Sequence, residues 1–238
     1  MKRIISSAVA LVAFCVAFAP VQASANSSHR WGGAYIGLHG GFAFTDLDWG
    51  LTYPYGAPPP STTLDVSNGV GGVHAGIQRQ FGTWVAGIEV AYTSGPGTQT
   101  EERVNLWAPN VGSLSADIGP ILTVSGRLGY DFGGLLAYVK AGYATADISL
   151  KANDGVPPNY GFDVSDRAHG FIVGAGGEIE LGKNIFFGLE YNYISLKHDF
   201  TTPVVVLSSG APLGPTSTSN VDTDIHSFLA RLTYKFSN

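Results

Sequence analysis

The feature that most constrains the fold is a strict two-residue alternation on both sides of a glycine-rich break at residues 131–134. One row of side chains is apolar or aromatic: Leu122, Val124, Gly126, Leu128 and Tyr130, then Leu135, Ala137, Val139, Ala141 and Tyr143. The opposite row carries Arg127 and Lys140 among small and polar residues. A period of two is typical of β-strands, and the break predicts a hairpin. A water-soluble sheet would bury the apolar row, whereas a membrane barrel would turn it toward lipid.

The same alternation recurs along the chain and predicts eight strands. They cover residues 33–44, 69–81, 84–92, 122–130, 135–144, 170–181, 186–193 and 227–236. Short turns alternate with long connections at residues 45–68, 95–116, 147–167 and 197–223. An even strand number with this alternation is typical of bacterial outer-membrane barrels, and lipid does not tolerate an open sheet edge. We therefore predict an all-β fold: an eight-stranded antiparallel up-and-down transmembrane β-barrel with short periplasmic turns and four long extracellular loops.

Aromatic residues cluster at both ends of the predicted strands. The turn ends carry Trp31, Phe81, Trp84, Tyr130, Tyr234 and Phe236, and the loop ends carry Phe44, Tyr92, Tyr143, Phe171, Tyr193 and Phe228. Aromatic girdles of this kind mark the two membrane–water interfaces. Arg79 shares the lipid-facing parity, and we expect it to extend toward the interface.

The N-terminus has the pattern of a cleaved export signal. Lys2 and Arg3 precede an apolar run, and small residues end it near Ala25. We predict a signal peptide at residues 1–25 and a barrel domain at residues 26–238, located in the bacterial outer membrane. The single cysteine, Cys15, leaves with the signal, so the mature chain has no disulfides. The mature chain is also acidic, which argues against a nucleic-acid partner.

The predicted inward row is rich in charge. It carries four acids and four bases: Glu89, Glu178, Glu180 and Glu190 with Arg127, Lys140, Arg231 and Lys235. An eight-stranded barrel has room only for its own side chains, which favours a packed, ion-paired interior, although the charges could also line a narrow ion path. The short turns further predict that Glu89 lies opposite Gly76, Glu190 opposite Gly176 and Glu178 opposite Gly188. We expect these glycines to leave space for carboxylates that reach across the lumen.

Other candidate chemistry is weaker. His39 and His74 point inward on neighbouring strands, but without a third ligand a hydrogen bond fits better than a metal or haem. His226 and Ser227 are adjacent in one strand, so they face opposite ways and are unsuited to a hydrolase pair. We predict no enzymatic activity, no cofactor and no metal site. The apolar residues 203–207 and 211–213 either pack on neighbouring loops or contact a partner.

Four motifs carry a resemblance to a known group: residues 31–37 (Trp-Gly-Gly-Ala-Tyr-Ile-Gly), 71–78 (Gly-Gly-Val-His-Ala-Gly-Ile-Gln), 126–130 (Gly-Arg-Leu-Gly-Tyr) and 231–236 (Arg-Leu-Thr-Tyr-Lys-Phe). The chain resembles small alphaproteobacterial outer-membrane proteins of the surface-antigen and hemin-binding group, whose architecture is that of the OmpA-like transmembrane barrel. The two-residue parity and the loop alternation favour a structural and surface-interaction role. The charged lumen leaves a small-solute porin as an alternative, and the inward histidines with the apolar loop leave a haem or host-ligand receptor.

The resemblance also implies partners. They are outer-membrane lipid and lipopolysaccharide, the outer-membrane assembly machinery and an extracellular partner at the loops. The assembly machinery would read Leu232, Tyr234 and Phe236 at the C-terminus. Two departures from the group are Ala230, where a glycine is common, and the two residues that follow Phe236.

Overall fold

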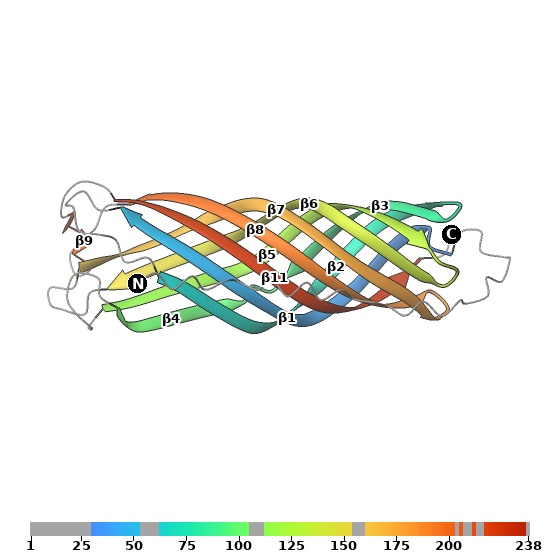
Figure 1. The fold of residues 1–238 in the computed structure, drawn as a ribbon, viewed down its shortest axis with the longest axis horizontal. Helices are drawn as coiled ribbons and strands as arrows, with labels where there is room; N and C mark the ends of the chain where they lie inside the picture. Colours follow the sequence, from blue (N-terminus) through green and yellow to red (C-terminus); the bar gives the residue numbers. More distant parts are fainter. Residues whose placement is uncertain are drawn as a thin grey trace, which may run out of the picture.

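The computed structural model describes residues 30–52, 62–104, 112–153, 160–202, 205–206, 211–212 and 217–236. These residues form a long barrel of tilted antiparallel strands (Figure 1). The predicted signal peptide lies outside the described residues. Among the residues that are described, no helix is long and apolar enough to cross a membrane.

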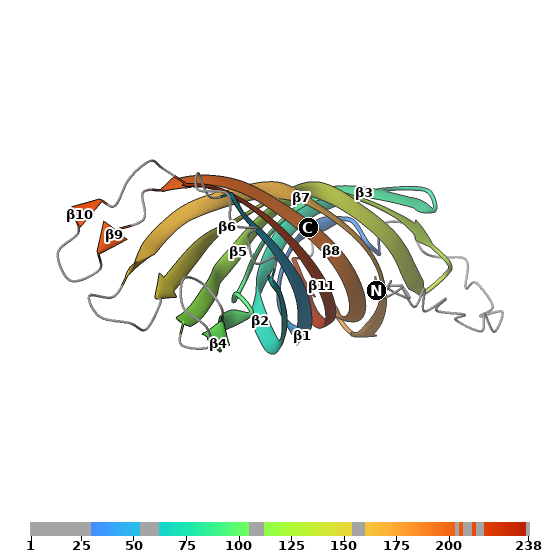
Figure 2. The ribbon, with the colours of Figure 1, turned by 60° about the vertical axis from the view of Figure 1, so that its left-hand side comes forward.

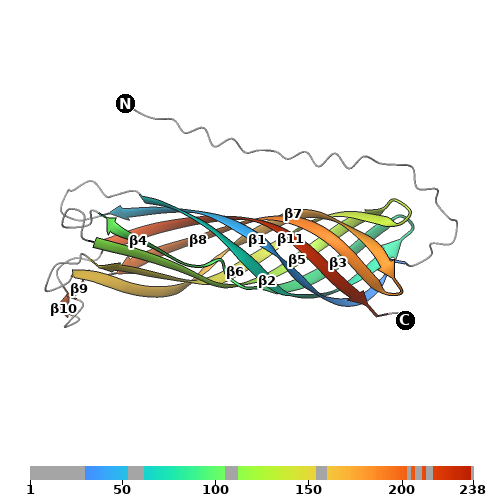
Figure 3. The ribbon, with the colours of Figure 1, turned by 90° about the horizontal axis from the view of Figure 1, so that it is seen from below.

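The strands follow one another around the wall. They are β1 (Gly33–Thr52), β2 (Thr62–Phe81), β3 (Trp84–Thr93), β4 (Gly97–Val104), β5 (Gly112–Asp131), β6 (Leu135–Asn153), β7 (Tyr160–Gly182), β8 (Ile185–Thr202), β9 (Val205–Val206), β10 (Ala211–Pro212) and β11 (Ser217–Lys235). β4 continues the wall position of β3, because both segments pair with β5. β1 pairs with β11 and closes the barrel, and the two strands lie side by side in Figures 1 and 3.

The predicted eight-stranded closed antiparallel barrel is confirmed. Its eight wall positions are β1, β2, β3 with β4, β5, β6, β7, β8 and β11. The remaining two strands, β9 and β10, form a small hairpin beyond the end of the wall, where β9 pairs with the start of β7 (Figure 2).

Three short turns lie together at one end of the barrel. Gly82, Gly133 and Gly134 have positive φ angles of 64°, 85° and 144° in the β2–β3 and β5–β6 turns. Asn184 has φ 65° between β7 and β8, a conformation that asparagine tolerates better than most residues. We call the half of the barrel next to these turns the lower half and the half next to the longer connections the upper half.

The lower half has the predicted polarity. Its outward side chains are apolar and open to the surroundings: Ile88, Leu128 and Val139 are 63%, 48% and 57% exposed. Glu89 and Arg127, on the opposite row, are 1% and 4% exposed. The apolar row therefore faces outward, which a water-soluble sheet with a core on that face would not allow.

The prediction of four long loops was wrong over most of their length. β1 continues to Thr52, and β6 and β7 remain paired up to Asn153 and Gly161. The alternation persists in these segments, but its polarity is exchanged. In β6, Ala144, Ala146, Ile148 and Leu150 point inward and are buried, while Asp147 and Lys151 point outward. The sequence prediction ended each strand at its last apolar outward residue. The strands continue beyond that point, so the predicted ends came too early.

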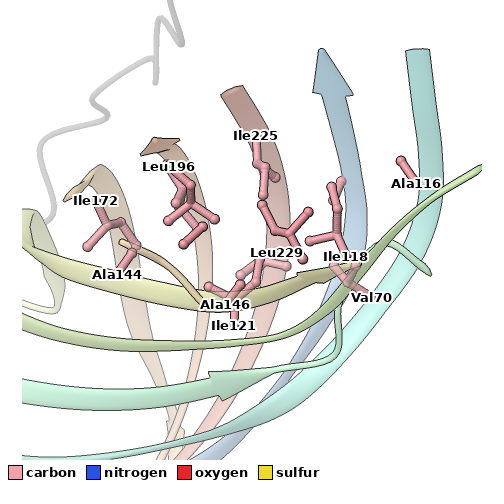
Figure 4. Packing of buried hydrophobic residues seen from close by; sticks show 14 of the residues in the cluster. Val70, Ala116, Ile118, Ile121, Ala144, Ala146, Ile172, Leu196, Ile225 and Leu229 are labelled. Carbon is pink, nitrogen blue, oxygen red and sulfur yellow. The ribbon is translucent and has the colours of Figure 1, made fainter. Parts of the chain in front are cut away.

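The upper half consequently has an apolar interior. The inward residues of this cluster are Ala43, Val70, Ala116, Ile118, Ile121, Ala144, Ala146, Ile148, Leu150, Ala168, Ile172, Ile194, Leu196, Ile225 and Leu229. Figure 4 shows most of these side chains projecting from several strands into the enclosed space. The packing is that of a water-soluble β-protein, with the core inside and charge outside.

Two interruptions divide the upper wall into two sheets. The β2–β3 ladder ends at the pair Gly72 and Thr93, and the β7–β8 ladder ends at the pair His169 and Lys197. Above these pairs, the described strands pair as β8–β11–β1–β2 and as β4–β5–β6–β7. The apolar cluster lies between the two sheets and takes residues from both, so upper-half cohesion depends on side-chain packing where the ladders stop.

Candidate functional site

Six charged side chains meet in the middle of the lower lumen. They come from six wall positions: Glu89 on β3, Arg127 on β5, Lys140 on β6, Glu178 on β7, Glu190 on β8 and Arg231 on β11. Each is no more than 5% exposed. We call this group the lumen cluster.

Arg231 is the centre of the lumen cluster. Its guanidinium donates to both Glu89 and Glu190, which approach from opposite sides of the barrel. Lys140 joins the same two carboxylates, with Nζ 3.3 Å from Glu89 Oε1 and 2.7 Å from Glu190 Oε1. Two carboxylates are thus held between two cations, which compensates charge that would be costly to bury alone.

Arg127 and Glu178 form the second part of the lumen cluster. Arg127 Nη2 lies 2.8 Å from Glu178 Oε1, and its guanidinium carbon lies 3.5 Å from the ring centroid of Tyr138. Glu178 also lies 3.8 Å from Arg231 Nε. The cluster therefore balances three acids with three bases and fills the section of lumen that an ion would have to cross.

The predicted cross-strand register is confirmed, but the glycines have a further purpose. Glu89 lies opposite Gly76, and Tyr35 lies opposite Gly76 on the other side. Tyr35 reaches across the glycine and donates its hydroxyl to Glu89 Oε2 at 3.0 Å. A Cβ on Gly76 would collide with that hydroxyl.

The same arrangement recurs on the other side of the barrel. Tyr138, Gly176 and Glu190 are aligned across β6, β7 and β8, and the Tyr138 hydroxyl donates to Glu190 Oε2 at 2.7 Å. A Cβ on Gly176 would meet Tyr138 in the same way. Sequence reasoning found the glycine opposite the glutamate but missed the tyrosine, because the tyrosine's strand joins the glycine's strand through a long connection that does not determine their register.

Two residues assigned to the charged lumen lie elsewhere. Glu180 and Lys235 sit near the short turns, where Arg30 Nε lies 3.5 Å from Glu180 and Lys235 donates to the backbone carbonyl of Arg30. The expected balance of four acids and four bases is therefore wrong for the lumen cluster, because strand tilt carries the last inward positions to the rim.

Trp31 also differs from the prediction of an outward girdle residue. It is 1% exposed and packs under the lower lumen with Val85, Leu136, Tyr138 and Phe186. Its amide N–H donates to Gln80 Oε1 at 3.0 Å, and Gln78 Nε2 donates to its carbonyl at 2.6 Å. Residue 31 precedes β1, so the two-residue parity of the strand does not determine its direction.

The two inward histidines bond to each other. His39 Nδ1 and His74 Nδ1 are 3.3 Å apart, and their Nε2 atoms lie 2.9 Å from the hydroxyls of Thr93 and Thr233. All four ring nitrogens have protein partners. Among the described residues, no group of three or more His, Cys, Asp or Glu side chains could hold a metal ion.

A small cavity separates the lumen cluster from the apolar cluster above it. His39, Lys140, Glu190 and Arg231 line its polar side, and apolar residues such as Ile172 line the other. Its volume of about 20 Å³ has room for one or two water molecules and no larger solute.

The remaining candidates occupy the faces that alternation assigns them. His226 points outward and Ser227 inward, so the pair does not share a face. Arg79 lies on the outer surface with its guanidinium carbon 5.4 Å from the ring centroid of Phe81. Leu232, Tyr234 and Phe236 form an exposed outward row at the end of the chain. Of the apolar loop segments, the structure describes only the backbone at 205–206 and 211–212.

Comparisons with known proteins agree with this architecture. The profile of the outer membrane protein beta-barrel domain family matches residues 9–236. No curated protein sequence matches significantly.

Two similar solved structures share the fold. The outer membrane protease OmpT from Escherichia coli aligns with a TM-score of 0.54 and 8% identity, covering 86% of this chain and 97% of that one. The outer membrane protein OprG from Pseudomonas aeruginosa aligns with a TM-score of 0.53 and 15% identity, covering 86% and 97%. At such identities the likeness concerns the fold alone. With the family profile spanning nearly all of the chain, the protein belongs to the outer membrane protein beta-barrel domain family.

Proposed function

We propose that this protein is a closed outer-membrane barrel with a structural role in the membrane and an interaction role at the cell surface. The observation that carries the proposal is the lumen cluster, in which Arg231 and Lys140 tie Glu89 to Glu190 across the full width of the barrel. Trp31 and its apolar neighbours fill the lumen below, and the apolar cluster fills it above. A barrel filled at three levels serves as a rigid membrane anchor for whatever its upper half presents.

The proposed orientation places the short turns in the periplasm and the upper half outside the cell. Long connections on the extracellular side are the rule for such barrels. The apolar outward segment of β6, Leu135–Tyr143, fits the roughly 9–11 residues that a tilted strand needs to cross a bilayer. The polar outer surface above it suits water better than lipid.

Export and assembly form part of the proposal. Residues 1–25 would be removed as a signal peptide, which N-terminal sequencing of the protein from outer-membrane fractions would test. Leu232, Tyr234 and Phe236 would be read by the assembly machinery, because their exposed row ends the closing strand β11. The finer relationship, to alphaproteobacterial surface antigens, also remains a proposal and rests on the sequence motifs.

Planar-bilayer recording from the purified, folded protein tests the closed lumen. We expect no stepwise conductance in the wild type. Discrete channels of uniform size in the wild type would contradict a closed lumen and favour the small-solute porin. A porin of known conductance, recorded in the same bilayers, serves as the positive control for sensitivity. A substitution in the lumen cluster alone would leave the lumen filled above and below it.

The alternative of a haem receptor using His39 and His74 gains no support from their positions. Both rings are buried inside the wall, and every ring nitrogen has a partner. We propose no enzymatic activity, since the charges of the lumen cluster are paired with one another and the cluster offers no cleft to a substrate. A surface ligand would instead contact the upper half.

A further inference from the structure

A group of basic side chains lies on the outer surface of β7 and β8, just above the upper aromatic girdle. Arg167 and His169 point outward from β7, and Lys197 lies directly opposite His169 on β8. The Arg167 and Lys197 side chains are 62% and 74% exposed. We call Arg167, His169 and Lys197 the basic triad.

Aromatic rings form a shelf directly below the basic triad. The Phe171 and Tyr193 rings pack edge to face with centroids 5.9 Å apart, and Tyr143 lies opposite Phe171 on β6. Tyr143 stacks on His169 with centroids 5.9 Å apart, and its hydroxyl bonds to His169 Nδ1. Below these rings the outward residues of β7 are apolar, beginning with Val173. Along the outer face of β7, apolar side chains are therefore followed by aromatic rings and then by basic side chains. Successive outward residues are two positions apart, which is roughly 7 Å along the strand.

Two acids hold the two cations of the triad in place without occupying all of their donors. Arg167 Nε and Nη2 donate to Asp147 at 2.9 and 3.5 Å. A guanidinium has five N–H donors, so further donors stay available on the outer side. Lys197 Nζ lies 3.6 Å from Asp222, a loose contact that leaves its ammonium open to a second anion.

The triad is restricted to one side of the barrel. On β2, after β3 and on β5, the described outward residues just above the apolar zone are Ser67, Ser94 and Pro120. On β1 and β11 they are Asp46 and Asp224, which lie opposite each other, and His226 lies directly below Asp224 against the Tyr191 and Tyr193 rings. A generic headgroup contact would distribute cations around the wall, whereas the described side chains concentrate them on β7 and β8.

We propose that the basic triad and its aromatic shelf bind the phosphates of a phosphorylated glycolipid in the outer leaflet. The order of surface chemistry along β7 and β8 matches such a lipid: acyl chains against Val173, sugar against the Phe171 and Tyr143 rings, and phosphates above them. Arg167 is paired toward β6 and Lys197 toward β11, so each cation offers its own phosphate contact. Charge-assisted N–H···O bonds to phosphate are strong for a guanidinium and for an ammonium. This inference rests on the proposed orientation, with the upper half outside the cell.

Native mass spectrometry of the folded full chain tests the site, with bis-phosphorylated lipid A as the probe. The protein is released from micelles that contain this lipid or its dephosphorylated form at equal concentration. We expect wild type to retain the phosphorylated form about fivefold better for each cation engaged, since a cation near an anionic lipid surface contributes about 1 kcal/mol. Lys197→Gln and Arg167→Gln should each lose about that factor.

Lys151→Gln is the matched control. Lys151 is another exposed cation of the upper half, and it pairs with Asp163 at 3.1 Å much as Arg167 pairs with Asp147, but it lies two outward positions above Asp147 and away from the rings. It should leave lipid retention unchanged. Each variant is first checked for wild-type migration before and after boiling, and if Arg167→Gln does not fold, Lys197→Gln carries the test.

Three results would overturn the proposal. The first is equal retention of both lipid A forms by wild type, and the second is an equal loss of retention in Lys151→Gln and Lys197→Gln. The third is retention of phosphatidylglycerol equal to that of phosphorylated lipid A, because the site would then not select an outer-leaflet glycolipid. Conductance of the same preparation is a separate readout. An open channel would refute the closed lumen without changing lipid retention.

Discussion

The lower and upper halves of this barrel use one backbone architecture with opposite polarity. In the lower half, Ile88 faces outward and Glu89 inward; in the upper half, Lys151 faces outward and Leu150 inward. The strands run through both halves, so the reversal of polarity does not come from a change of backbone fold. It reflects the solvent on each side: hydrocarbon rejects charge, whereas water rejects apolar surface.

The two halves also maintain their interiors by different forces. The lower interior depends on directed contacts among a few buried charges, each of which needs its partners. The upper interior depends on apolar packing of many small contributions, which also holds together two sheets that no longer pair at two places. A single substitution should therefore be most damaging at the centre of the lower half and more local in the upper half.

The largest expected effect comes from Arg231→Met, which removes the cation shared by Glu89 and Glu190. Leaving buried carboxylates without this partner should cost about 3–5 kcal/mol of unfolding free energy. Urea unfolding of the folded protein in detergent, followed by tryptophan fluorescence, measures the loss. A variant as stable as wild type would show that the lumen cluster is not what stabilises the lower half.

Leu196→Ala should have the next largest effect, and it should be local. Leu196 is 0% exposed within the apolar cluster, and truncating such a side chain typically costs about 2–5 kcal/mol. Limited proteolysis should show faster cleavage of the upper half while the lower half stays protected. Loss of protection in both halves at once would contradict their independence.

Outward substitutions at equivalent parity sharpen the comparison further. Ile88→Lys places a charge on the lower surface and should cost about 2–4 kcal/mol near the bilayer midplane. Ser149→Lys, also outward but in the upper half, should change stability by no more than about 0.5 kcal/mol. Equal costs in urea titrations of the two lipid-embedded variants would place both positions in the same solvent.

The smallest effect concerns the exposed pair of Asp147 and Arg167. The hydrogen bond from Arg167 lowers the pKa of the Asp147 carboxyl below its usual value. The pair's contribution is therefore present above the ordinary aspartate pKa and is lost as pH falls through the lowered one. Proteolytic protection of the upper half should weaken slightly at acidic pH in wild type. The Asp147→Asn variant should be slightly less protected than wild type at neutral pH, and its protection should not depend on pH in this way.

Most features of the lower half could be predicted from the sequence. Parity alone predicted the outward direction of Leu128 and Val139, and the short turns predicted that Glu89 lies opposite Gly76. These predictions succeeded because turn length determines register and register determines which side chains face each other. Trp31 could not be placed in this way, because it lies before the first strand.

The strands of the upper half were not predicted, and the reason is physical. Ala144, Ala146, Ile148 and Leu150 alternate as regularly as the residues before them, but the apolar row changes faces between Tyr143 and Ala144. A search for one continuous apolar face ends at that point. The Tyr35 and Tyr138 hydroxyls were missed for another reason: their partners lie two strands away, beyond the reach of pairwise register.

The polarity reversal can be tested most directly by spin labels at single cysteines in the lipid-embedded barrel, which is practical because the sole native cysteine, Cys15, lies in the predicted signal. The three positions are Val139, Lys151 and Leu150. We expect a label at 139 to collide mainly with dissolved oxygen, a label at 151 with a water-soluble nickel chelate, and a label at 150 with neither. Oxygen contact at 151 together with chelate contact at 150 would contradict the reversal and the division of the barrel into two solvents.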